Sequence, residues 1–358
     1  MSELRGAGLL GTGIGVLAAG AAVGSLLGSA VERRMLRRPL ADAADHLLGL
    51  GSLHAPPQVV AADDGVQLYA EVDEPEPYAD QVQYPGLSVV FCHGYALNLD
   101  CWHYQRMALR GRVRCVYWDQ RGHGRSGRGE PGPVPIDRLG ADLRAVLEAT
   151  VPPGEPVVVV GHSMGGMTVM ALADQRPELF GDRVVGVALL STSAGAMAGI
   201  TLGVPAAAAR VLRRAAPAAM SALGRAPRLV ELGRRTGNDL DFMLTRVYSF
   251  ASDVPPAVVD FVRQMNAGTP IGVVADFFPA FADHDKFEAL PVLQRVHALV
   301  MVGADDLLTP ADHSRAIAAA VPGAELVVVP DCGHMVMLEH PQLVDDRLGE
   351  LLDQVLGR

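Results

Sequence analysis

Short apolar runs and longer amphipathic stretches alternate along the chain from about residue 58 to the C-terminus. The short runs are rich in valine and predict buried strands, at residues 59–62, 66–72, 87–92, 113–119, 157–160, 184–191, 298–302 and 324–329. The amphipathic stretches predict helices, at residues 136–149, 312–320 and 342–356. Strands that alternate with helices indicate a mostly parallel sheet with helices on both faces.

The alternation stops after the sixth of these strands. Residues 201–235 carry seven arginines and one acid, interleaved with apolar residues and interrupted by prolines. Many of the chain's few aromatic residues follow, and we expect most of them to form the segment's own core, with a few lining a passage for a small molecule. We therefore predict a helical cap over 192–290, inserted between two parts of one core domain, 58–191 and 291–358.

The first part of the chain has a different pattern. Residues 6–31 carry no charge, a length that could span a bilayer, and arginines follow directly. We expect 1–31 to be a single-pass membrane anchor and 32–57 a juxtamembrane linker, with the bulk of the protein on the cytoplasmic side. The alternatives are a signal peptide cleaved near Gly28–Ala30, which would make the protein secreted, and a loosely ordered Gly/Ala tail.

The composition of the chain excludes several classes of partner and ligand. The net charge of −10 argues against nucleic acid. The four cysteines, Cys92, Cys101, Cys115 and Cys332, show no metal-type spacing and are expected to be reduced. The histidines also lack metal-ligand spacing, so we expect no metal and no cofactor.

The most informative motif is Gly161-x-Ser163-x-Gly165. It follows four consecutive valines and precedes an apolar, alanine-rich stretch, which is the strand–turn–helix context of a nucleophile elbow. Such a turn is so tight that side chains two positions either side of the serine would collide with backbone. Ser163 is the candidate nucleophile.

A serine hydroxyl needs a base, and the base needs an orienting carboxylate. Asp305 and Asp306 follow the strand at 298–302, and His334 follows the strand at 324–329. Both segments should lie at the carboxyl edge of the sheet, where α/β proteins bind their ligands. Either acid could complete the set.

These motifs resemble those of the α/β-hydrolase fold superfamily, from about residue 58 to the C-terminus. The quoted matches, besides the elbow, are His93–Gly94, Asp119-x-Arg121-Gly122-x-Gly124-x-Ser126 and Gly333–His334. The resemblance implies an α/β-hydrolase fold with a mostly parallel eight-stranded sheet, flanking helices and a helical cap.

The resemblance also implies roles for individual residues. Ser163 would be the nucleophile, His334 the general base and acid, and Asp306 the orienting carboxylate, because it lies four residues before a proline. The backbone N–H groups of Tyr95 and Met164 would form the oxyanion hole. Gly94, Gly161 and Gly165 would be the loop and elbow glycines, while His93 and His162 would brace loops.

A serine at the elbow favours acyl transfer, since the epoxide hydrolases and haloalkane dehalogenases of this superfamily use an aspartate. The motifs are most similar to bacterial carboxylesterases and monoacylglycerol-lipase-like enzymes, which implies a small-molecule ester as substrate. A cofactor-free haloperoxidase with the same triad and a non-catalytic binding protein of the same fold are the alternatives. The oligomeric state stays open.

Overall fold

The computed structural model describes residues 49–75, 83–197, 202–203, 211, 214–216, 218–219 and 238–358. The expected anchor 1–31 lies outside the described residues, as do most of the linker 32–57 and most of the arginine-rich stretch 201–235. Within the described ranges, no helix combines the length and the apolar character needed to cross a membrane.

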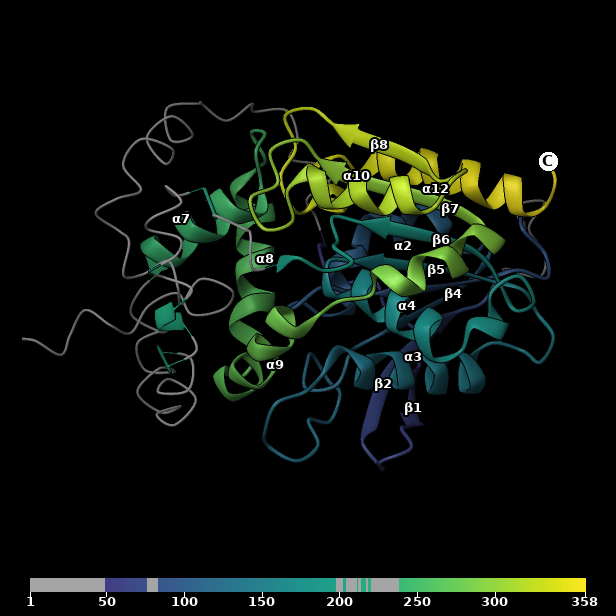
Figure 1. Cartoon of the computed structure of the whole chain (residues 1–358), viewed down its shortest axis with the longest axis horizontal. Helices are drawn as coiled ribbons and strands as arrows, with labels where there is room; N and C mark the ends of the chain where they lie inside the picture. Colours follow the sequence, from purple (N-terminus) through teal and green to yellow (C-terminus); the bar gives the residue numbers. More distant parts are fainter. Residues whose placement is uncertain are drawn as a thin grey trace, which may run out of the picture.

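Eight strands form one sheet (Figure 1). In chain order they are β1 (Pro57–Ala61), β2 (Gln67–Asp73), β3 (Ser88–Cys92), β4 (Arg114–Trp118), β5 (Val157–His162), β6 (Val184–Leu190), β7 (His297–Gly303) and β8 (Glu325–Val329). Across the sheet the order is β1-β2-β4-β3-β5-β6-β7-β8. Two pairings, β1 with β2 and β2 with β4, are antiparallel, and the others are parallel. The eight-stranded, mostly parallel sheet is thus confirmed.

Each central strand supplies two cores, because successive side chains point to opposite faces. In β3, Val89 and Phe91 belong to one cluster of buried side chains, and Val90 and Cys92 belong to another. A shift of one residue in register would exchange the two sets and move Phe91 into the other core.

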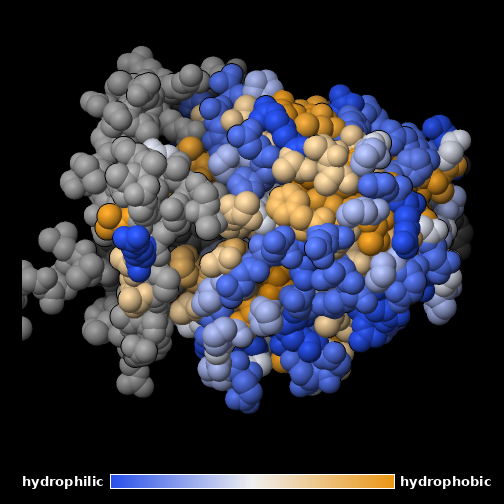
Figure 2. Space-filling model, in the orientation of Figure 1, coloured by the Kyte–Doolittle hydropathy of each residue, from blue (hydrophilic) through white to orange (hydrophobic). Residues whose placement is uncertain are grey.

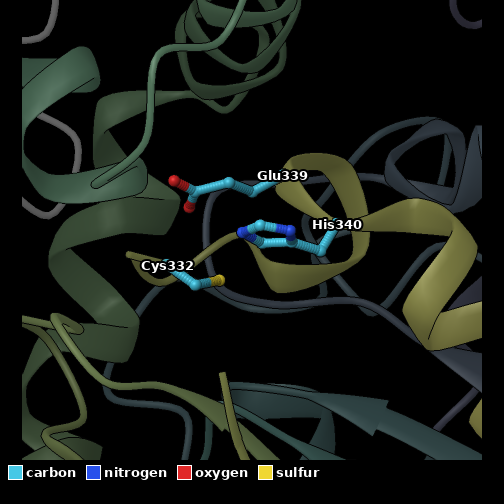
Figure 3. A group of neighbouring side chains, drawn as sticks. All are labelled: Cys332, Glu339 and His340. Atoms are coloured by element: carbon cyan, nitrogen blue, oxygen red, sulfur yellow. The ribbon is translucent and has the colours of Figure 1, made fainter. Parts of the chain in front are cut away.

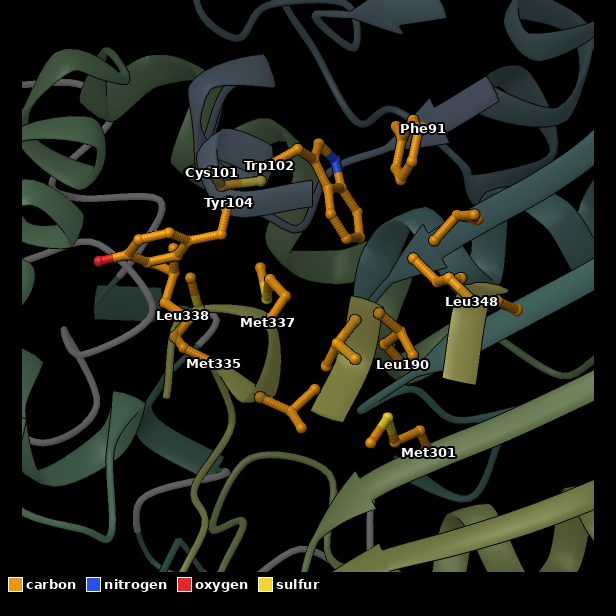
Figure 4. Close-up of a cluster of buried hydrophobic side chains, with 14 of the residues drawn as sticks. Phe91, Cys101, Trp102, Tyr104, Leu190, Met301, Met335, Met337, Leu338 and Leu348 are labelled. Carbon is orange, nitrogen blue, oxygen red and sulfur yellow. The ribbon is translucent and has the colours of Figure 1, made fainter. Parts of the chain in front are cut away.

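Helices cover both faces of the sheet (Figure 1). The first core is closed by α2 (His103–Leu109), α11 (Val336–Glu339) and α12 (Pro341–Val355), and the second by α3 (Ile136–Thr150), α4 (Met164–Gln175) and α10 (Ala311–Ala320). Figure 4 shows the first core, where Phe91, Trp102 and Leu348 lie among the side chains of the sheet. The α2 helix was not predicted, since its seven residues are too few for a clear period.

Further helices occupy the described part of the segment between β6 and β7. They are α7 (Asn238–Ser249), α8 (Pro256–Gly268), α9 (Ile271–Asp283) and the 3-10 segment η6 (Phe287–Arg295). In Figure 1, α7, α8 and α9 lie together beyond one end of the sheet. Phe250 is buried in the first core, and Phe277 packs with Tyr95 and Met164. These two aromatic residues therefore pack the inserted segment against the sheet domain, and do not serve only as the segment's own core.

The surface is mainly hydrophilic on the face shown in Figure 2. Among the described residues, the exposed large apolar side chains are Val59, Met107, Val211, Phe287 and Leu326. Single apolar side chains of this kind are normal on a protein surface.

Candidate active site

Ser163 occupies the sharp turn between β5 and α4. Its backbone has φ 53° and ψ −118°, a conformation that costs a residue with a Cβ about 1–3 kcal/mol. The Ser163 N–H donates to the carbonyl of Leu190 at 2.9 Å, and the Thr192 hydroxyl donates to the Ser163 carbonyl at 2.7 Å. Hydrogen bonds to the residues at and after the end of β6 thus hold the strained serine.

The two glycines of the motif make room for this turn. A Cβ placed on Gly161 would lie 2.6 Å from the backbone nitrogen of Gly166. A Cβ on Gly165 would overlap the backbone carbonyl of Cys92 at the end of β3. Because these neighbours are backbone atoms, no side-chain rotation could relieve the contact.

Asp306 and His334 form a buried pair. His334 Nδ1 lies 2.8 Å from Asp306 Oδ2, and the two side chains are 7% and 0% exposed. Asp306 follows β7 and His334 follows β8, and these neighbouring parallel strands bring both loops to one sheet edge. Asp305, the other acid, is exposed. The structure therefore joins Asp306, and not Asp305, to the imidazole.

Hydrogen bonds hold Asp306 in its charged form. Its oxygens accept the N–H groups of Leu308 at 2.8 Å and Thr309 at 2.9 Å, and the Thr309 hydroxyl at 2.9 Å. Burial raises the pKa of Asp306, but the charge of His334 and these bonds outweigh burial, so the pKa lies below its usual value. An ionised carboxylate at this position favours the tautomer of His334 that carries its proton on Nδ1.

His162, the residue before Ser163, links the elbow to the His334 loop. Nε2 of His162 lies 3.0 Å from the His334 carbonyl oxygen, and the two imidazole rings are 4.8 Å apart. Within the described part of the chain, no hydrogen bond joins the Ser163 hydroxyl to His334. Such bonds are often long without substrate and shorten when it binds.

Two further backbone N–H groups belong to the elbow and to the loop after β3. β3 pairs with β5 in parallel, with Cys92 opposite Gly161, so the loop after β3 lies beside the elbow. Among the described residues, the N–H groups of Tyr95 and Met164 have no hydrogen-bond acceptor. These are the two N–H groups that the resemblance assigns to the oxyanion hole.

Two other histidines brace the loops, as expected. His93 Nδ1 lies 2.7 Å from the carbonyl oxygen of Gly94, and its Nε2 accepts the N–H of Gln120 at 2.9 Å. Burial lowers the pKa of His162 to about 3 and that of His93 well below its usual value, so both are neutral at pH 7.

A family model described as alpha/beta hydrolase fold matches residues 88–341. The chain belongs to the α/β-hydrolase fold family.

Other comparisons agree on this fold. The α/β-hydrolase chain is 30% identical over 267 residues to the dihydrolipoyllysine-residue acetyltransferase component of the acetoin cleaving system of Pseudomonas putida, with 74% of this chain and 62% of that protein covered. The chain thus spans less than two thirds of that relative. An esterase from Thermogutta terrifontis superposes with TM-score 0.65 at 25% identity, covering 84% of this chain and 99% of that one. A bromoperoxidase from Bacillus anthracis, with TM-score 0.63, 19% identity and coverage of 83% and 100%, shares the fold.

Among the residues that the structure describes, one cluster of metal-ligand residue types lies outside the site residues predicted from the sequence. Donor atoms of Cys332, Glu339 and His340 lie within 4.8 Å of one another (Figure 3). Burial, with the charge of Glu339 added to it, raises the pKa of the Cys332 thiol well above its usual range. Both oxygens of Glu339 already accept backbone N–H groups. A metal ion binds a deprotonated thiolate and a carboxylate with free oxygens, so these residues are poorly suited to hold one.

Sequence reasoning missed the residues that support this site. Thr192 and Thr309 follow strands, but nothing in their spacing distinguishes them from other threonines. Glu339 lies six residues after Gly333 in the segment that contains His334, and that segment was interpreted for its histidine alone. Thr192 and Glu339 bind backbone groups of segments that only the folded chain brings near, and Thr309 binds the carboxylate of Asp306.

Proposed function

We propose that the protein is a serine hydrolase that cleaves carboxylic esters through an acyl-enzyme. The observation that carries the proposal is the strained Ser163 turn at the sheet edge that also holds the Asp306–His334 pair. The similarity to an esterase at 25% identity supports it.

The proposed reaction uses five groups of this chain. Ser163 Oγ attacks the carbonyl carbon of the ester, while Nε2 of His334 takes the hydroxyl proton. Asp306 holds the imidazole and stabilises its positive charge, and the N–H groups of Tyr95 and Met164 donate to the oxyanion. The C–O bond to the alcohol then breaks, and His334 gives its proton to the leaving oxygen. Water, deprotonated by His334, hydrolyses the acyl-enzyme in the same way and frees Ser163.

The substrate class follows from the apolar side chains around the oxyanion loop. Tyr95, Met164 and Phe277 belong to one buried cluster, and Phe278 and Phe281 pack against it partly buried. The ring centroids of Tyr95 and Phe281 are 4.9 Å apart. These surroundings favour an ester with an apolar acyl or alcohol part, including acylglycerol-type esters.

Labelling with a fluorophosphonate tests the assignment. The wild-type protein should react, and Ser163→Ala should abolish the reaction and lower kcat by about 10³-fold or more, with the melting temperature retained. Ser191→Ala is the control, because Ser191 is also buried beside the sheet edge and its hydroxyl has no partner among the described residues. Ester turnover by Ser163→Ala at the wild-type rate would exclude the proposal.

A series of nitrophenyl esters of increasing chain length then measures the acyl preference. The same preparation, assayed with peroxide and bromide, distinguishes an esterase from a haloperoxidase. A folded wild-type protein that neither labels nor turns over any of these substrates would instead be a non-catalytic binding protein.

For localisation, we propose that residues 6–31 anchor the protein in the cell membrane, with the catalytic domain on the cytoplasmic side. The uncharged run and the arginines after it support this proposal. The full chain should remain in the membrane pellet after an alkaline carbonate wash. A secreted, shortened product would support the signal peptide instead.

A further inference from the structure

Glu339 binds two segments that are far apart in the chain. Its Oε1 accepts the N–H of Ala251 at 2.8 Å and also the N–H of Ser252. Its Oε2 accepts the N–H of Gly333 at 2.7 Å. One carboxylate therefore links the loop that carries His334 to the segment between cap helices α7 and α8.

The same two segments also meet through backbone. The N–H of Met335 donates to the carbonyl of Ser249 at 2.9 Å. A Cβ on Gly333 would lie 2.8 Å from the backbone of Phe250, so the two segments are in close contact there. The residues on both sides of His334 are thus attached to residues 249–252.

These contacts fix the position of the His334 backbone, which the hydrogen bond to Asp306 does not fix. Asp306 holds Nδ1 of the imidazole, but the position of the ring also depends on where the His334 backbone lies. His162 holds the His334 carbonyl, and Glu339 holds the preceding peptide through Gly333. One side chain thus fixes the peptide before His334 and the segment at residues 251 and 252 at the same time.

The geometry points to Glu339 as a positioning residue that sets His334 against Ser163 and couples this setting to the cap. The inference rests on the proposed ester hydrolysis, since it gives His334 the role of general base. Cap residues 249–252 would then help to determine the rate of the chemical step as well as access to the site.

Glu339→Gln provides the test, because glutamine has the same shape but only one accepting oxygen. The amide can accept from Ala251 and Ser252 or from Gly333, and its NH₂ group would face the remaining N–H donors. We expect kcat to fall by about tenfold to a hundredfold with little change in KM, the size of effect that a small misplacement of a catalytic group produces. Glu339→Asp, which keeps the charge but is shorter, should show a smaller loss in the same direction.

His340→Gln is the matched control. His340 belongs to the same cluster, and its Nε2 has no hydrogen-bond partner among the described residues. This variant leaves the Glu339 bonds in place and should retain the wild-type kcat. An equal loss of kcat in Glu339→Gln and His340→Gln would overturn the inference, because any disturbance of this loop would then lower the rate.

A second readout does not depend on substrate. The Nδ1 proton that His334 shares with Asp306 should give a low-field proton NMR resonance, assigned by its loss in Asp306→Asn. Glu339→Gln should move or broaden this resonance in the folded protein, and Glu339→Asp should do so if the glutamine variant does not fold. A folded Glu339→Gln with unchanged kcat and an unchanged resonance would refute the inference. A wild-type protein without esterase activity would defeat only the proposed function, since the resonance still measures the link.

Discussion

Ser163 is held by a strand, a turn and a helix that are continuous in the chain, whereas His334 depends on groups from separate segments. At the elbow, β5, Gly161, Gly165 and α4 create the strained conformation, and two bonds from the end of β6 support it. At His334 the contacts come from residues 162, 249, 306 and 339, either directly or through the adjoining residues.

The two halves of the site should therefore respond differently to substitution. The two elbow glycines are enclosed by backbone, so a side chain added at Gly161 or Gly165 should act first on the stability of the fold. The His334 loop is held by side-chain hydrogen bonds, so a change there can misplace the imidazole while the sheet remains intact. The predictions below separate these two kinds of damage.

The largest effect is expected at Asp306. Asp306→Asn should lower kcat by about 10²–10⁴-fold, because the amide would favour the wrong tautomer of His334. Asp305→Asn should change kcat little, since Asp305 is exposed and Asp306 holds the imidazole. Steady-state kinetics of both variants with one ester give the comparison. A greater loss for Asp305→Asn would mean that Asp305, and not Asp306, orients the imidazole.

A smaller effect, and one on stability, is expected at the elbow. Gly165→Ala should lower the free energy of unfolding by about 1–3 kcal/mol, the usual cost of forcing an extra group into a packed interior, because its Cβ would overlap the Cys92 carbonyl. Gly268→Ala is the control, since a Cβ there has no neighbour within 4 Å. Urea denaturation measures both variants. Equal stability of Gly165→Ala and the wild type would mean that the elbow can widen.

The smallest effect is a pH dependence of stability. The pKa of Asp306 is lower in the folded protein than its usual value, so the folded state binds this proton less readily than the unfolded chain does. The stabilisation by Asp306 should therefore be complete above about pH 4, its unfolded pKa, and decline as the pH falls further. The difference in unfolding free energy between wild type and Asp306→Asn should shrink below that pH. A constant difference from pH 7 to pH 3 would contradict the argument.

The sequence by itself determined the sheet and the order of the candidate residues along it. Apolar runs predicted the eight strands, and the signal is clearest for inner strands such as β3 and β5, because a strand buried on both faces needs apolar side chains at nearly every position. The elbow could be predicted because the motif and its strand–turn–helix context are adjacent in the chain. A parallel sheet then places the ends of β5, β7 and β8 at one edge, which is why Ser163, Asp306 and His334 could be placed there together.

Only the tertiary structure decided which neighbouring acid meets the imidazole and which groups hold the His334 loop. Asp305 and Asp306 differ by one position, and the path of the loop after β7 buries one and exposes the other. Glu339 and residues 249–252 are more than eighty positions apart, and they meet because the segment between β6 and β7 returns to the sheet edge. Hydrogen bonds between such distant segments leave no periodic pattern in a sequence, since they depend on where folded elements come to rest.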